Sequence, residues 1–108
     1  MLEISFHQAA EEEMNAAAAY YAAQHDGLSE AFLAEVSIGL QQIQRWPLAW
    51  SVLADDFRRY LLHRFPYGLI YRIADDHIFI LAVAHLRRKP GYWIRRTKED
   101  ERRIPRNY

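Results

Sequence analysis

The sequence contains no cysteine, so disulfide bonds and thiolate chemistry are both excluded. No apolar run approaches the roughly 18 to 20 residues that a membrane-spanning helix requires. The first residues, MLEISFHQAAEEE, have neither the basic start nor the apolar stretch of a secretory signal. We therefore expect a soluble, cytoplasmic protein that has no membrane partner.

Basic residues are scarce in the first half of the chain. Residues 1–56 contain one basic residue, Arg45, against nine acidic residues, a net charge of −8 with histidines neutral. Residues 57–108 contain 13 basic residues against five acidic ones, a net charge of +8. This asymmetry suggests an anionic partner for the second half, either nucleic acid or an acidic protein segment. Alternatively, the two halves face each other and neutralise one another within the fold.

Glycine and proline are also scarce, with four of each, and they divide the chain into a few regular elements. Residues 8–24 contain neither and are rich in alanine, which predicts a helix. After Gly27, a second helix is predicted from its cap, Ser29, to about Trp46, where Pro47 stops it. The short connection predicts an antiparallel helix hairpin. The apolar residues that recur at helical spacing along the two helices are Ala10, Met14, Ala17, Tyr21, Phe32, Val36, Leu40 and Ile43.

The rest of the chain has the patterns of strands. Residues 2–6 alternate apolar and polar side chains, and three later segments are rich in aromatic and β-branched residues. These segments are 57–65, 68–74 and 77–85, and the turn signals Pro66-Tyr67-Gly68 and Asp75-Asp76 separate them. Short connections between successive strands predict an antiparallel meander.

The predicted fold is therefore α+β. It consists of a strand, a two-helix antiparallel hairpin and a three-stranded antiparallel meander, all within a single domain of residues 1–108. One face of the sheet should pack against the hairpin, and the other could be left open. Residues 94–108 are strongly charged and are predicted to form a short helix or a solvated tail.

Arginines accompany the predicted strands. Because alternate residues of a strand share a face, Arg58 and Arg64 are expected on one face and Arg59 on the other. Arg72 lies on the next strand, within cross-strand reach. On an uncovered sheet face, guanidinium groups would bind phosphate or carboxylate oxygens bidentately. The alternative is that these arginines are solvated charges that protect sheet edges from aggregation.

The last predicted strand ends in a histidine followed by basic and aromatic residues. His85 is a candidate acid or base because imidazole titrates near neutral pH and Arg87 and Arg88 lie close by, although a lone histidine is usually structural. Tyr92 and Trp93 could stack on a base or fill the core. The five histidines show no metal-ligand spacing, so neither a metal nor another cofactor is expected.

Two segments carry a resemblance to a known family. RRYLLHRFPYGLIYRI (58–73) and IFILAVAHLRRKPGYW (78–93), together with an earlier YY……GLS..F..EV pattern, resemble toxins of the RelE/ParE superfamily. The likeness covers roughly residues 3–95. Its most specific parts are FPY at 65–67 and AH at 84–85, with the arginine pair that follows. The fold of this superfamily is a strand, a two-helix hairpin and an antiparallel meander.

This resemblance implies a growth-inhibiting toxin of a bacterial type II toxin–antitoxin, or plasmid-stabilisation, module. Such a toxin is neutralised by a cognate antitoxin, whose C-terminal segment typically wraps around it, and an acidic segment would suit the basic half of this chain. Two toxic activities occur in the superfamily. RelE-like members are metal-free ribonucleases that cut messenger RNA on the ribosome, whereas ParE-like members inhibit DNA gyrase by binding.

The resemblance also assigns roles to residues. In a ribonuclease, His85 would be the acid or base, Tyr92 the stacking group or proton donor, and Arg64 and Arg72 the phosphate clamps. Leu86 stands where a RelE-like enzyme should have an arginine, which favours the ParE-like branch and gyrase as the target. A non-toxic relative that only binds its antitoxin is a third possibility. The residues expected to bind phosphate or the antitoxin tail are Arg59, Arg64, Arg72, Arg87, Arg88 and Trp93.

Overall fold

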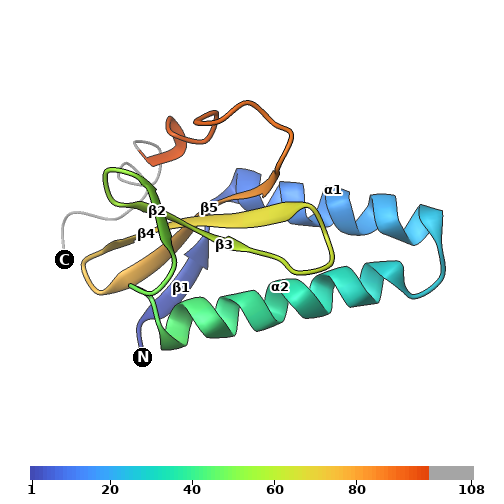
Figure 1. Ribbon diagram of the computed structural model, residues 1–108, viewed down its shortest axis with the longest axis horizontal. Coiled ribbons are helices and arrows are strands. Elements are labelled where there is room, and N and C mark those ends of the chain that lie inside the picture. Colours follow the sequence, from blue (N-terminus) through green and yellow to red (C-terminus); the bar gives the residue numbers. More distant parts are fainter. Residues whose placement is uncertain (98–108) are drawn as a thin grey trace.

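A five-stranded sheet with a helix hairpin on one face forms the body of the protein (Figure 1). The computed structural model describes residues 1–97, so most of the predicted charged tail lies outside the described residues. Its elements are β1 (Glu3–Phe6), α1 (Gln8–Gln24), α2 (Leu28–Arg45), β2 (Ser51–Ala54), β3 (Phe57–Leu61), β4 (Tyr67–Ala74) and β5 (His77–His85). The predicted α+β class and the order of strand, helix hairpin and meander are confirmed.

The strand order in the sheet is β1-β5-β4-β3-β2. Strands β3, β4 and β5 form the predicted antiparallel meander. Strand β1 pairs with β5 in parallel, with Glu3 opposite His77. Asp75 and Asp76 both have positive φ, which is the geometry of the tight turn that joins two strands of a hairpin. The edge strand β2 was missed in the sequence, because its four residues, SVLA, are all exposed and show no alternation of apolar and polar side chains.

The helix hairpin packs on one face of the sheet through the predicted apolar residues. Phe32, Val36 and Ile43 of α2 are buried together with Ala10 and Ala17 of α1. The predicted cap at Ser29 is wrong. The cap residue of α2 is Gly27, whose φ of 86° suits glycine, and the helix begins at Leu28.

Strand β3 is shorter than predicted and ends at Leu61 rather than at residue 65. The chain turns because the amide of Leu62 donates to the carbonyl oxygen of Tyr67. The next two amides, of His63 and Arg64, donate to the carboxylate of Glu35 on α2 instead of to a strand. Arg64 therefore lies in a loop and does not share a strand face with Arg58, contrary to the prediction.

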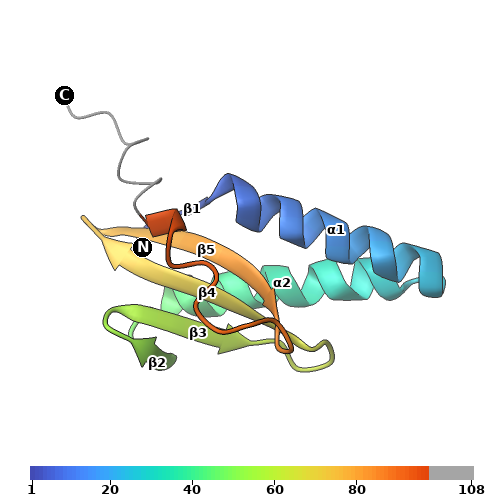
Figure 2. The same ribbon diagram turned by 90° about the horizontal axis from the view of Figure 1, so that it is seen from above.

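The second face of the sheet is not open, contrary to expectation. The segment after β5, residues 86–97, crosses this face, and Figure 2 shows it in front of β4 and β5 with α2 behind the sheet. Trp93 is 5% exposed and packs on Phe57, with ring centroids 4.8 Å apart. A β-bulge leaves Leu81 without a partner on β4, and both Leu81 and Ala82 join the apolar cluster beneath Trp93. The sheet thus has apolar packing on both faces.

Tyr71 gives the fold a predicted sensitivity to alkaline pH. Burial raises the pKa of its phenol from 10.0 to about 12, and its hydroxyl donates to the carbonyl oxygen of Pro47. Unfolded tyrosine loses its proton above about pH 10, while folded Tyr71 keeps it until about pH 12. The stabilisation is therefore fully present below pH 10 and is lost as the pH rises toward 12.

We expect the Tyr71→Phe variant to lose about 1 kcal/mol of unfolding free energy at pH 8, because one hydrogen bond is removed. Between pH 10 and pH 11, its unfolding free energy should fall by about 1 kcal/mol less than that of the wild type. Urea denaturation at each pH measures both quantities. Parallel pH profiles for the two proteins would contradict the assignment.

Candidate functional site

A cationic surface forms where the β3–β4 loop and the turn after β5 lie side by side. The amide of Leu86 donates to the carbonyl oxygen of Pro66 at 2.9 Å, which joins the two segments. This brings exposed Arg64 and Arg87 to the same end of the sheet as His85. Neither guanidinium group has an ion-pair partner among residues 1–97. We call His63, Arg64, His85 and Arg87 the basic end of the sheet.

His85 is half-buried in the basic end. Its Nδ1 atom accepts a hydrogen bond from the amide of Arg87 at 3.1 Å, and its ring packs edge-on against Tyr67, with centroids 5.1 Å apart. Because Nδ1 is an acceptor, the neutral imidazole carries its hydrogen on Nε2. A shallow hollow of about 290 Å³ beside the ring is also lined by Tyr20, Tyr67 and Glu13. The ring is therefore held in a fixed orientation next to a solvent-accessible hollow.

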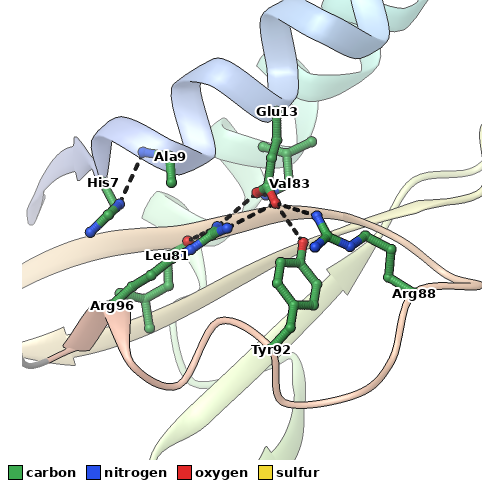
Figure 3. A network of polar contacts seen from close by, with 8 residues as sticks. All are labelled: His7, Ala9, Glu13, Leu81, Val83, Arg88, Tyr92 and Arg96. Carbon is green, nitrogen blue, oxygen red and sulfur yellow. Dashed lines mark hydrogen bonds and ion pairs between the residues drawn. The ribbon is translucent and has the colours of Figure 1, made fainter.

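Glu13 of α1 is the centre of a polar network that ties the C-terminal segment to the fold (Figure 3). Its Oε2 atom accepts hydrogen bonds from the Tyr92 hydroxyl at 2.7 Å and from Arg88 Nη1 at 3.1 Å. Arg96 donates to both carboxylate oxygens, at 2.8 and 3.0 Å. The side chains of Glu13 and Arg96 are only 15% and 14% exposed. Two cations and a phenol thus share one nearly buried carboxylate.

The same two side chains satisfy backbone groups on the edge of β5. Strand β1 ends at Phe6, opposite Ile80, so it does not cover the later residues of β5. The Val83 amide donates to Glu13 Oε1 at 3.0 Å, and Arg96 donates to the Leu81 carbonyl at 2.9 Å. Glu13 and Arg96 therefore replace the missing strand neighbour at this edge, where unpaired backbone groups would otherwise be costly.

Tyr92 is held as a neutral hydrogen-bond donor. Burial is the main cause that raises the pKa of its phenol well above 10.0, and the hydrogen bond to Glu13 and the carboxylate charge raise it further. Arg88 and Arg96 lower this pKa in part, and the Arg88 guanidinium lies 3.6 Å from the ring centroid. The Tyr92 hydroxyl is thus engaged by the Glu13 carboxylate within the fold.

The remaining predicted arginines have different environments. Arg72 pairs with Asp56 at 3.3 Å, and Arg58 donates to the carbonyl oxygens of Leu48 and Trp50. Arg59 lies opposite Ile70 on the second face of the sheet, away from Arg58 as the alternation predicted, and Arg72 faces the same side. It lines a pocket of about 360 Å³ between the edge of the sheet and the C-terminal segment.

The structure therefore divides the predicted site residues into three groups. Arg64, His85 and Arg87 come together at the basic end. Arg59 lines the pocket on the second face of the sheet, which His85 also borders. The third group is tied to other parts of the fold and comprises Arg72, Arg88, Tyr92 and Trp93. Ion pairs within the fold thus neutralise part of the charge asymmetry, and Arg59, Arg64 and Arg87 have no ion pair among residues 1–97.

Glu13 was not among the residues predicted for the site. The sequence does contain a signal for it, because Glu13 lies three residues after Ala10 and four before Ala17, both of which face the core. A carboxylate at such a position needs a partner, and the basic second half could supply one. The described residues hold no cluster of histidine, aspartate and glutamate side chains suited to a metal ion. Within the same residues, neither helix has the length and apolar character needed to cross a bilayer.

Comparisons with known proteins place this architecture in a class. A solved structure described as the chromosomal ParDE TA system from P. aeruginosa matches 80% of this chain and 97% of its own, with a TM-score of 0.59 and 17% sequence identity. At this identity, the match establishes the shared fold. The hairpin-and-meander architecture is thus that of the RelE/ParE superfamily of toxins.

The family model narrows the assignment. Residues 4–90 match the model of the ParE toxin of the type II toxin-antitoxin system, parDE, which covers most of the chain. The chain belongs to this ParE toxin family. No curated protein matches the chain significantly.

Proposed function

We propose that this protein inhibits DNA gyrase in the bacterial cytoplasm and is held inactive by a cognate antitoxin with an acidic segment. Membership of the ParE toxin family supports the toxin role and implies an antitoxin partner. The hydrogen-bonded environment of Tyr92 supports gyrase, rather than messenger RNA, as the proposed target. Tyr92, one of the two groups assigned to acid–base chemistry, keeps its proton in a hydrogen bond to Glu13 and has a raised pKa.

A ribonuclease of the RelE kind would need groups free to move protons and to stabilise a phosphorane. Arg72, one of its two expected phosphate clamps, is paired with Asp56 on the second face of the sheet. Arg64, the other, lies in the loop at the basic end, as does His85. His85 and Tyr92 both line the pocket on the second face of the sheet, but Arg64 and Arg72 do not, so the four residues do not converge there. This arrangement favours a protein that acts by binding.

The basic end is the surface that we assign to the antitoxin. Exposed apolar side chains accompany its cations: Leu86 follows His85 directly, and Leu61 lies at the end of β3. Tyr20, more than half exposed, lines the hollow beside His85. A mixed cationic and apolar surface suits an amphipathic segment with acidic side chains, which can fold as it binds.

The test compares the two toxic activities with one protein preparation. We expect the purified protein to block the supercoiling of relaxed plasmid by gyrase and to leave ribosome-bound messenger RNA intact. Adding the product of the adjacent antitoxin gene should restore supercoiling. Cleavage of the message with normal supercoiling would overturn the proposal, and the His85→Ala variant would then show whether His85 takes part in cleavage.

Inducing the gene alone in a bacterial host distinguishes the two toxic activities from the third possibility, a non-toxic relative that only binds its antitoxin. Growth should stop, and DNA synthesis should fall before protein synthesis. Uninterrupted growth with a stably folded protein would indicate a relative that binds an antitoxin without being toxic.

A further inference from the structure

The pocket on the second face of the sheet contains a cation that the proposed function does not use. This cation is Arg59, and the aliphatic part of its side chain lies against Gly68 of β4. A β-carbon at Gly68 would come within 2.9 Å of both Cγ and Cδ of Arg59, so the glycine makes room for the arginine. Small residues thus hollow the sheet beneath this side chain, and Ala84, opposite Gly68 on β5, continues the same surface.

Arg59 also has a hydrogen-bonding capacity that the fold does not use. Its Nε atom is buried and has no acceptor within the described part of the chain. Its guanidinium likewise forms no ion pair with residues 1–97, in contrast to Arg72 on the neighbouring strand, which pairs with Asp56. A buried donor of this kind is rare in folded proteins, and a carboxylate oxygen is the acceptor that best matches it.

The walls of the pocket are mainly apolar. Leu53 and Ile70 come from the sheet, and Trp93 and Ile94 come from the C-terminal segment. No acidic residue lines the pocket. Its cations besides Arg59 are Arg88, which shares the Glu13 carboxylate with Arg96, and the exposed Lys89. The volume of about 360 Å³ is within the range of small-ligand sites.

We propose that this pocket binds a monoanionic carboxylate carried on an apolar body, with the carboxylate on Arg59 and the body against Trp93 and Ile70. A carboxylate brings one negative charge and an acceptor for the buried Nε of Arg59, whereas a phosphate dianion would bring a second charge against the apolar walls. The carboxylate can belong to a small aryl or branched-chain acid, or to the C-terminal residue of a peptide. This site is independent of the gyrase target proposed above.

Indole-3-propionate and its neutral amide are a matched pair of probes for the pocket. We expect the acid to shift amide resonances of residues 53–54, 59 and 84–94 of the isotope-labelled protein, saturably, with a dissociation constant on the order of 1 mM or tighter. The amide should bind at least tenfold more weakly. Equal binding of acid and amide, or the absence of saturable shifts in these residues, would overturn the proposal without any variant being made.

The Arg59→Gln variant tests the role of the cation. It keeps the stem over Gly68 and should weaken binding of the acid about tenfold or more. Arg87→Gln removes the same charge from an exposed side chain outside the pocket and should leave the affinity within about twofold of the wild type. If both variants bind as the wild type does, the anion does not contact Arg59 and the proposal fails.

A second pair of probes distinguishes the source of the carboxylate. A short peptide ending in phenylalanine is titrated with its C-terminus free and with it amidated. Displacement of indole-3-propionate by the free peptide alone identifies a chain terminus as a ligand. Binding of the small acid without binding of either peptide identifies a free metabolite. Both results support the site. Gyrase inhibition, measured in parallel, tests the proposed function separately.

Discussion

Replacing Trp93 by alanine should lower the unfolding free energy by about 3 to 5 kcal/mol. The indole is 5% exposed and is the largest side chain that the C-terminal segment buries on the second face of the sheet. Its removal leaves a cavity over Phe57 and Ile70, since these residues belong to the sheet and cannot collapse to fill the space. Urea denaturation monitored by far-ultraviolet circular dichroism gives the free energy.

The neighbouring residue provides a matched control for this prediction. Ile94 is half-exposed in the same segment, and the Ile94→Ala variant should lose less than about 1 kcal/mol. Trp93→Phe keeps an aromatic ring and should recover part of the loss. If Trp93→Ala were as stable as the wild type and bound its antitoxin poorly, Trp93 would be a contact residue, as its position beside the arginine pair first suggested.

The Glu13→Gln variant should lose about 3 kcal/mol of unfolding free energy. Glutamine has nearly the same shape, but it removes the negative charge that Arg88 and Arg96 share. Arg96 would then be a nearly buried cation without that carboxylate. Glutamine offers one oxygen in place of two, so either the Tyr92 hydroxyl or the Val83 amide also loses its acceptor. The expected loss therefore combines the missing charge with one hydrogen bond.

Glu12, one residue earlier on α1, is the control for this charge. It is exposed and accepts a hydrogen bond from Gln8 at the surface, so Glu12→Gln should change the unfolding free energy by less than about 0.5 kcal/mol. Hydrogen exchange locates the effect of Glu13→Gln. Faster exchange should appear at Val83 and in residues 86–97 before it appears in α2. Equal stability of the two variants would mean that the network contributes little.

The sequence was informative where a local pattern repeats. Helix spacing located both helices, and runs of β-branched and aromatic residues located the meander, because burial of one face imposes those periods on the residues. Strand β2 has no such pattern, since its four residues are exposed and are held by pairing with β3. A strand defined only by its neighbour's hydrogen bonds has no signal of its own.

The site was harder to predict because its contacts join distant parts of the chain. The sequence predicted His85, Arg64 and Arg87 as site residues, and of these His85 and Arg87 lie at or directly after the end of the buried strand β5. It could not show that Glu13 takes up Arg88 and Tyr92, because that contact depends on where the chain turns after β5. The packing of Trp93 on the second face also depends on where the chain turns after β5. As a result, part of the face that we expected to be an open binding surface is packed core.

The pairing of the first strand with the last sets a condition on how the protein is made. Glu3 meets His77 only after residue 77 has been synthesised, and synthesis proceeds at about 5 to 20 residues per second. Until β5 has left the ribosome, β1 has no neighbour and the sheet is incomplete. A chain that terminates before β5 therefore lacks the finished sheet and also lacks His85 and Arg87 of the basic end.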